Sequence, residues 1–316
     1  MSLSVLISNY NYAQYLDASL TAIVSQSLQP KEIIIIDDAS TDNSVEIIKN
    51  YQKKFPNITF YENPKNLGVI ANANRAIDLA TGKYIALCAT DDEILPGFFE
   101  ESIALLSLHP NAGMCVSKFS TFWDNNPEKL STFSAYLAKK KCFLSPNEFT
   151  DKIKFRDVRI GGLTNIYRKD AILSCGKLDP QLRQMCDWFL IYSIAFRYGV
   201  CYIPKALTKM RLHEKSYSFQ LAKNKELNKN TFISIHKILK NKDFHDINKK
   251  FISSGIIYQI GFSILPLLFS KEYKIYLNIP FIFHCFIATL KCLKHKITLY
   301  RTWFSIKILQ HKRESF

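Results

Sequence analysis

The feature that most constrains the fold is a run of four isoleucines at residues 33–36, followed directly by two aspartates. A run that is apolar at every position suits a central parallel strand with helices on both faces. Two further apolar runs occur at residues 4–8 and 84–89, and segments with helical spacing of apolar residues lie between the runs. We therefore predict an α/β doubly wound sheet flanked by helices, in which ligands bind beyond the carboxyl ends of the strands.

Polar side chains stand at the end of each of these three runs or just beyond it. They are Ser8 and Tyr10 at the first, Asp37 and Asp38 at the second, and Asp91 and Asp92 at the third. Adjacent carboxylates at the end of a buried strand repel each other unless a hard cation or hydrogen-bond donors offset their charge. The pattern predicts a divalent cation, Mn²⁺ or Mg²⁺, that shares its coordination between carboxylate, phosphate oxygens and water.

Simpler roles remain open for both aspartate pairs. Asp91 and Asp92 can cap a helix that begins near Leu95, since Asp is a common cap residue. Asp37 and Asp38 can simply start the turn in DDASTDNS. The chain contains neither G-x-G-x-x-G nor a P-loop, so phosphate has to be held by metal and side chains.

Four segments of the chain resemble the nucleotide-sugar-binding half of the family 2 glycosyltransferases, which are inverting enzymes of the GT-A fold. They read VLISNYNYAQYLDASLTAIVSQS, EIIIIDDASTDNS, NLGVIANANRAIDLATGKYIAL and ATDDEILPGF, and the resemblance covers residues 2–218. It implies a GT-A type mixed sheet in which Ser8, Tyr10 and Asp38 contact the nucleoside. It also implies that Asp92 binds the metal and that Asp91 lies nearer the ribose.

The chain departs from the family pattern at two places. Many members have a further Asp where this chain has Ala89, so the metal shell is lean. The helix that usually reads A-R-N has Ala73 and Asn74, with the arginine one place later. Arg75 is therefore the candidate for the basic contact to the donor diphosphate.

Inverting transfer also requires a base that deprotonates the acceptor hydroxyl. The family usually supplies an acidic residue before a Trp, and in CGKLDPQLRQMCDWFLIY this position is Asp187, while Asp179 fits the preceding loop. The alternative role of Asp187 is a helix cap. The segment ALTKMRLHEKSYS resembles the family's R-x-H-x-x-S, which implies that Arg211 and His213 reach the diphosphate or metal, His213 as a metal ligand. Otherwise His213 is a surface residue that titrates near neutrality.

Charge separates the front of the chain from its rear. The formal net charge is +15, yet residues 1–110 carry 7 basic and 13 acidic residues, residues 111–220 carry 18 and 9, and residues 221–316 carry 17 and 5. An acidic front argues against nucleic acid as a partner, and a basic rear favours phosphate or an anionic membrane leaflet.

The rear also contains long uncharged stretches, at residues 251–270 and 275–290. About 20 apolar residues can just cross a bilayer. Polar residues in the first stretch and the shortness of the second favour helices that lie in or dip into the cytoplasmic leaflet. Alternatively, these helices form an apolar lid on the enzyme or a contact in a homo-oligomer.

These observations predict two parts, a GT-A domain over residues 1–218 and a basic, apolar helical extension over residues 219–316. Within the domain, residues 1–110 would bind the nucleotide sugar and residues 111–218 would supply the acceptor and catalytic part. Eight cysteines without a C-x-x-C pair, and a first strand with no signal peptide before it, predict a cytoplasmic protein with reduced thiols.

The predicted activity is metal-dependent, inverting transfer of a sugar from a nucleotide-diphosphate sugar, with a UDP-sugar as the leading candidate. The acceptor would be a glycan or a lipid-linked molecule at the cytoplasmic face of the membrane, in surface polysaccharide or glycoconjugate biosynthesis. One alternative is a catalytically inert glycan- or nucleotide-binding protein on the same scaffold. A nucleotidyltransferase is disfavoured, because SNYNYAQYL after the first strand is not a Gly- and Arg/Lys-rich loop.

Overall fold

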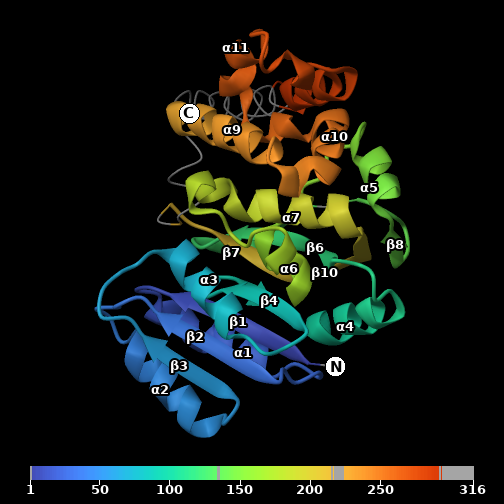
Figure 1. The fold of residues 1–316 in the computed structure, drawn as a ribbon. Helices are drawn as coiled ribbons and strands as arrows, with labels where there is room; N and C mark the ends of the chain where they lie inside the picture. The colour runs from blue at the N-terminus through green and yellow to red at the C-terminus, as the bar shows by residue number, and fades with distance from the viewer. Residues whose placement is uncertain (1, 134–135, 215, 217–223, 292, 294–316) are drawn as a thin grey trace, which may run out of the picture.

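A computed structural model describes residues 2–133, 136–214, 216, 224–291 and 293 (Figure 1). Its centre is a ten-stranded sheet of order β3-β2-β1-β4-β9-β6-β10-β5, with β7 paired to β6 and β8 paired to β10. The strands are β1 (Leu3–Asn9), β2 (Glu32–Asp37), β3 (Ile58–Glu62), β4 (Tyr84–Ala89), β5 (Glu93–Ile94), β6 (Met114–Trp123), β7 (Asn126–Phe133), β8 (Cys142–Leu144), β9 (Asn165–Arg168) and β10 (Val200–Leu212).

The first four strands of that order are parallel, whereas β9 runs antiparallel to both β4 and β6. The sheet is therefore mixed, and the predicted doubly wound α/β architecture is confirmed. Parallel pairing brings the carboxyl ends of β1, β2 and β4 to one edge, because Ser8 stands in register with Ile36 on one side and Ala89 on the other.

The four isoleucines of β2 explain why the sheet needs two covered faces. Side chains alternate along a strand, and Ile33 and Ile35 belong to one hydrophobic cluster while Ile34 and Ile36 belong to the other. The first cluster includes α1 (Ala13–Val24), α2 (Ser44–Lys54) and α4 (Phe98–Leu108). The second includes α3 (Val69–Leu79), α5 (Pro146–Ile153), α6 (Lys169–Ser174) and α7 (Cys186–Tyr198).

The helical extension packs against α7 on the side away from the sheet (Figure 1). Its elements are α9 (Lys225–Leu239), η3 (Lys242–Phe244), α10 (His245–Ser254), η4 (Ile256–Ile260), η5 (Phe262–Ile264), α11 (Leu265–Leu268), η6 (Lys274–Tyr276) and helical residues 279–291. Phe251 of α10 stacks on Phe189 of α7 with ring centroids 5.4 Å apart. Extension and α7 thus share one hydrophobic core, and the domain boundary near residue 218 stays a prediction.

The uncharged stretch 251–270 is broken into short pieces rather than folded as one helix. The breaks fall at Gly255 and Gly261, whose φ angles are +69° and +113°. A Cβ at Gly255 would also lie 2.4 Å from the backbone nitrogen of Phe281, so only glycine fits this contact. Within the described residues, no helix has the length and apolar character needed to cross a bilayer.

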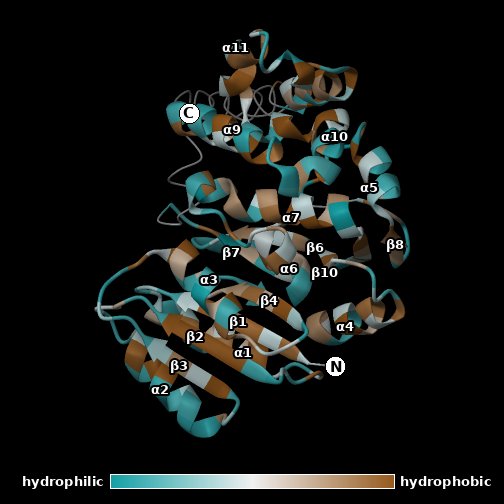
Figure 2. Ribbon diagram, viewed as in Figure 1, coloured by the Kyte–Doolittle hydropathy of each residue, from teal (hydrophilic) through white to brown (hydrophobic). Residues whose placement is uncertain are grey.

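Hydropathy coloring of the ribbon shows apolar residues along the central strands and through the stacked helices of the extension (Figure 2). The seven cysteines among the described residues are free thiols. Cys292 lies outside the described residues.

Candidate active site

The first aspartate pair closes β2, and its two side chains have different partners. Asp37 Oδ2 accepts hydrogen bonds from Asn9 Nδ2 and Ser40 Oγ, both at 2.7 Å, and Oδ1 accepts from the backbone N–H of Ser40 at 2.8 Å. Asp37 thus starts a turn, which is the simpler role that the sequence left open for it. The turn carries the chain from β2 toward α2.

Asp38 instead bonds to the loop that leads into α3. Its Oδ1 accepts from Leu67 N at 2.8 Å and Asn63 Nδ2 at 2.9 Å, and its Oδ2 accepts from Gly68 N at 2.8 Å. Burial alone would raise the pKa of Asp38, but Asn72 and these three donors outweigh it and lower the pKa below its ordinary value. The Asp38 carboxylate is therefore stable as an anion without any bound cation.

Arg75 of α3 is connected to the Asp38 carboxylate through Asn63, which bonds to both residues. Its Nη1 donates to Asn63 Oδ1 at 2.7 Å, and its guanidinium stands 5.1 Å from the centre of the Tyr61 ring. Ser8 is half-buried at the end of β1, and Tyr10 is 46% exposed just beyond it. The sequence-predicted residues Ser8, Tyr10, Asp38 and Arg75 thus all lie at or near one edge of the sheet, and their ligand contacts stay predictions.

The second aspartate pair follows β4, and the helix-cap alternative for it is wrong. Helix α4 begins at Phe98 with Gly97 as its cap residue, and the short strand β5 stands between the pair and that helix. Asp92 Oδ1 accepts a hydrogen bond from the backbone N–H of Arg211 at 2.9 Å. Asp91 Oδ2 lies 2.9 Å from His213 Nε2.

The electrostatics of this pair are opposite to those of Asp38. Burial raises the pKa of Asp92 well above its ordinary value, and the Asp91 carboxylate raises it further, while the N–H and guanidinium of Arg211 only partly offset these effects. Two like charges side by side in a partly buried site favour either a proton or a cation. Asp92 is the group at this edge that a divalent ion would stabilise.

Arg211 has an evident structural role that the sequence did not reveal. Its guanidinium lies 4.6 Å from the ring centres of both Tyr15 and Phe122, and Nη1 donates to Asp124 Oδ1 at 2.9 Å. Its Nε donates to the backbone oxygen of Asp91 at 2.9 Å. Arg211 therefore fixes the backbone of the aspartate pair, and contact with a diphosphate stays a prediction.

His213 packs against two tyrosine rings, Tyr12 and Tyr15, which the sequence did not identify as part of the site. The Tyr12 and Tyr15 rings stand 5.8 and 5.9 Å from the imidazole. Burial and the nearby Asp91 carboxylate raise the pKa of the Tyr12 hydroxyl, so it stays protonated near neutral pH and is available as a donor. The position of these tyrosines at the start of α1, just after β1, is the one sequence signal that could have identified them.

Asp187 is the second residue of α7, and the cap position belongs to Met185, so the cap alternative for Asp187 is also wrong. Its Oδ1 accepts from the Trp188 backbone N–H at 2.7 Å. A Cβ at Gly162 would lie 2.7 Å from Asp187 Oδ2, so the second glycine of RIGGL leaves room for this carboxylate. The segment Gly162–Thr164 also packs against β4, β6 and β10, which places Asp187 over the centre of the sheet.

Burial raises the pKa of Asp187. A carboxylate with a raised pKa is a stronger base, which is the property that proton abstraction from a hydroxyl requires. Asp179, eight residues earlier, instead caps the 3-10 helix η2 (Pro180–Met185) by accepting from Gln181 N at 2.8 Å.

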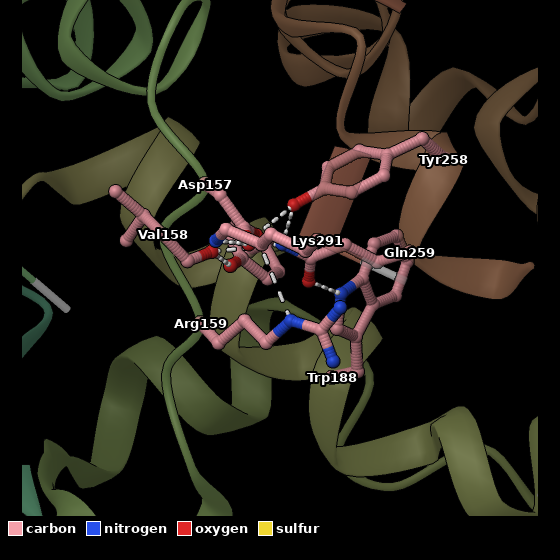
Figure 3. Close-up of polar contacts among 8 residues, drawn as sticks. Asp157, Val158, Arg159, Trp188, Tyr258, Gln259 and Lys291 are labelled. Atoms are coloured by element: carbon pink, nitrogen blue, oxygen red, sulfur yellow. Dashed lines mark hydrogen bonds and ion pairs between the residues drawn. The ribbon is translucent and has the colours of Figure 1, made fainter. Parts of the chain in front are cut away.

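The extension holds the residue next to Asp187 in place (Figure 3). Trp188 Nε1 donates to Gln259 Oε1 at 2.8 Å, and Gln259 Nε2 donates to the Val158 backbone oxygen at 2.8 Å. The same network contains Asp157, which bonds to Tyr258 and Lys291. Burial alone would raise the pKa of Asp157, but the Lys291 ammonium and the Tyr258 hydroxyl lower it.

The Asp38 carboxylate and the Asp91–Asp92 pair thus lie at one edge of the sheet, and the Asp187 carboxylate lies over its centre. Comparison with known proteins decides the family. The family model described as glycosyl transferase family 2 matches residues 4–168, which is more than half of the chain. The chain belongs to glycosyl transferase family 2.

Family relatives extend the match beyond that segment. An uncharacterized glycosyltransferase of Escherichia coli, YibD, is 27% identical over 270 residues, covering 81% of this chain and 74% of the relative. An uncharacterized glycosyltransferase of Methanocaldococcus jannaschii is 29% identical over 233 residues, covering 70% and 75%.

Solved structures of similar fold confirm the GT-A type fold. Staphylococcus aureus TarS residues 1–349 in complex with UDP-GlcNAc match with a TM-score of 0.63 at 18% identity, covering 87% of this chain and 78% of that one. A mannosyltransferase of Pyrobaculum calidifontis in complex with GDP-Man and Mn²⁺ matches with a TM-score of 0.56 at 16% identity, covering 95% and 82%.

Proposed function

We propose that this family 2 glycosyltransferase transfers a sugar, with inversion, from a UDP-sugar to a glycan or lipid-linked acceptor, and that it requires Mn²⁺ or Mg²⁺. The observation that carries the proposal is the Asp91–Asp92 pair at the same sheet edge as Asp38. Donors of the protein satisfy Asp38, whereas Arg211 only partly offsets the charge of Asp92. This difference fits a ligand with a neutral end and a metal-bound diphosphate end.

In this proposal Asp38, Ser8 and Tyr10 contact the nucleoside. A carboxylate has about four lone-pair sites. Asn63, Leu67 and Gly68 already donate to Asp38, and the Asn72 amide also lowers its pKa. An N–H of the base would therefore share the carboxylate with one of these donors. Arg75 would lie toward the diphosphate and Asp91 toward the ribose.

The residues present fit a divalent cation with few protein ligands. Asp92 is a hard oxygen ligand with a raised pKa, and His213 lies next to its neighbour Asp91. Among the described residues, no three His, Cys, Asp or Glu side chains cluster closely enough to hold a metal ion by themselves. When bound, the ion would neutralise charge on the departing diphosphate, and phosphate oxygens and water would complete its shell.

Asp187 is the proposed base. It would accept the proton of the acceptor hydroxyl as that oxygen attacks the anomeric carbon, while the bond from that carbon to the diphosphate breaks. Gly162 leaves room for the carboxylate, and the anchored Trp188 fixes its backbone.

Donor screening tests the activity. We expect sugar-dependent release of nucleoside diphosphate from one member of a panel of UDP-, GDP- and dTDP-sugars, supplied with Mn²⁺ or Mg²⁺, with and without detergent-solubilised lipid acceptor. Transfer that continues undiminished in EDTA would overturn the metal requirement. Asp187→Asn should remove transfer and retain donor binding, whereas a wild-type protein that binds donors and turns none over would support the inert binding protein.

We also propose that the extension binds an anionic membrane at its cytoplasmic face. Residues 221–316 carry 17 basic and 5 acidic residues. Large apolar side chains of the extension are exposed to solvent, and they are Phe262, Phe269, Ile275, Ile279, Ile282, Phe286, Leu290 and Leu293. Apolar area combined with positive charge is the signature of interfacial binding.

Vesicle sedimentation tests this surface. The full chain should sediment with phosphatidylglycerol vesicles and less with phosphatidylcholine vesicles. The double variant Phe269→Asp with Ile279→Asp should lose most of that binding, since both side chains are 74% exposed. Leu108→Asp is the matched control, because Leu108 is equally exposed but lies on α4. Equal binding by all three proteins would contradict the proposal and favour an apolar contact between copies of the chain.

A further inference from the structure

A pocket lined mainly by polar residues lies between the 3-10 helix η2 and helix α9, outside the predicted donor site. Its volume is about 310 Å³, which is at the lower end of the size range of small-ligand sites, about 300–1,000 Å³. The residues that line it are Gln181, Arg183, Asn224, Glu226, Leu227, Asn230, Thr231 and Ser234. Its size suits one small ring rather than an extended ligand.

Seven of the eight lining residues have polar side chains of mixed kinds, while apolar atoms supply the larger part of the lining surface. It contains amides, hydroxyls, one guanidinium and one carboxylate around the buried Leu227 side chain. Amides and hydroxyls both donate and accept, the carboxylate only accepts and the guanidinium only donates. Such a mixture suits a neutral polyhydroxylated ligand better than a phosphate, because Glu226 would repel an anion.

Helix α9 presents one face to this pocket. Glu226, Asn230 and Ser234 are spaced four residues apart, so their side chains lie one above the other on the helix. Thr231, on the same side, is almost fully buried, and its hydroxyl has no hydrogen-bond partner. This face of α9 thus contains a hydroxyl that makes no hydrogen bond within the described part of the protein.

Arg183, on the opposite wall, has a strained backbone. Its φ and ψ angles are +47° and −122°, a combination rarely adopted by residues other than glycine. The residue is exposed, and its side chain has no hydrogen bond or ion pair with any other described residue. Strained non-glycine residues concentrate at ligand-binding and active sites, and here the strain presents a guanidinium beside the pocket.

The pocket is linked to both the proposed base and the donor edge. Arg183 precedes Asp187 by four residues, and Gln184 Nε2 bonds to Asn228 Oδ1 of α9 at 3.2 Å. Asn74 of α3 bonds to both the nitrogen and the oxygen of Leu178, at 3.1 and 2.8 Å, just before η2. The wall of the pocket is therefore fixed to the helix whose start holds Asp38.

We propose that this pocket binds a neutral pyranose ring of the acceptor, so that the extension selects the acceptor glycan. The proposal rests on the proposed glycosyl transfer and names the class of molecule that receives the sugar. The ring would pack on Leu227, and its hydroxyls would bond to Arg183, Asn230 and Glu226.

Saturation-transfer NMR on the full chain with saturating UDP and Mn²⁺ tests the pocket. The probes are the methyl pyranosides of glucose, galactose, mannose and N-acetylglucosamine. We expect at least one to bind, and Arg183→Ala and Asn230→Ala each to weaken that binding about tenfold, as the loss of one good hydrogen bond can. Lys225→Ala is the matched control, because Lys225 is exposed on α9 and does not line the pocket.

The possible results distinguish a failure of the pocket proposal from a failure of the proposed glycosyl transfer. Thermal unfolding confirms that each variant is folded, and UDP binding measured in the same samples reports the donor edge. Absence of binding by all four glycosides, or equal binding by the variants and wild type, would overturn the pocket while UDP binding persists. Failure of the wild type to bind any nucleoside diphosphate would count against the proposed donor instead.

Discussion

The two Asp-Asp pairs have the same sequence and opposite surroundings. Asp37 and Asp38 receive six hydrogen bonds from amides and a hydroxyl, and the pKa of Asp38 is lowered. Asp92 receives a single backbone N–H bond from Arg211, and its pKa is raised. The first pair is complete within the protein, whereas the second pair is the place where a cation would relieve repulsion.

The largest expected effect is on catalysis at the second pair. Asp92→Asn should lower the rate of sugar transfer about 10²- to 10³-fold, because a metal ion contributes several kcal/mol of transition-state stabilisation. In the presence of UDP, Mn²⁺ should raise the melting temperature of the wild type but not that of the variant. Steady-state rates and thermal shifts measure both effects. A variant with wild-type rates would place the metal elsewhere.

The next largest effect is on protein stability in the absence of metal, where substitutions in the two pairs should have opposite effects. Asp38→Asn should lower the free energy of unfolding by about 2–4 kcal/mol. The N–H groups of Leu67 and Gly68 bond to different carboxylate oxygens, so the amide NH₂ group would face one of these two donors. Asp92→Asn should instead raise it by about 1 kcal/mol in EDTA, because one of two repelling charges is removed. Urea unfolding checks both values, and the same sign for both variants would break the comparison.

These pairs also show how far the sequence predicts the site. The isoleucine run and the strand endings were sufficient to predict the sheet, its two covered faces and the edge at which the polar strand endings meet. Only the family resemblance gave Asp38 and Asp92 different roles. The residues alone could not show their different surroundings, because the donors to Asp38 come from Leu67 and Gly68 and the donor to Asp92 comes from Arg211, more than a hundred residues away. The RIGGL glycine beside Asp187 was missed for the same reason.

A pH dependence should follow from the lowered pKa of Asp38. A carboxyl with a lower pKa in the folded state stabilises the protein fully above its unfolded value, near 3.8, and loses that contribution as pH falls through the folded-state pKa. The stability difference between wild type and Asp38→Asn should therefore shrink below pH 3.8. Urea midpoints at pH 7 and pH 3 test this expectation, which a constant difference would contradict.

Asp187 is intermediate between the two aspartate pairs. Its Oδ1 accepts a hydrogen bond from Trp188 N, and Gln259 anchors that tryptophan. Gln259→Leu would leave the Trp188 indole N–H and the Val158 carbonyl without this partner. We expect a loss of about 1–3 kcal/mol in the free energy of unfolding and a lower kcat with unchanged donor KM. Gln52→Leu is the control, because Gln52 is exposed and makes one long bond of 3.5 Å. Equal effects of the two variants would show that the anchor has no special role.

The central claim is that the Asp91–Asp92 pair needs a cation to hold a nucleoside diphosphate. Titration calorimetry of UDP into wild type and Asp92→Asn, each in Mn²⁺ and in EDTA, tests it directly. We predict that Mn²⁺ strengthens UDP binding to the wild type at least about tenfold, equivalent to about 1.4 kcal/mol, and does not strengthen binding to Asp92→Asn. Equally tight UDP binding in Mn²⁺ and EDTA by the wild type would contradict the account.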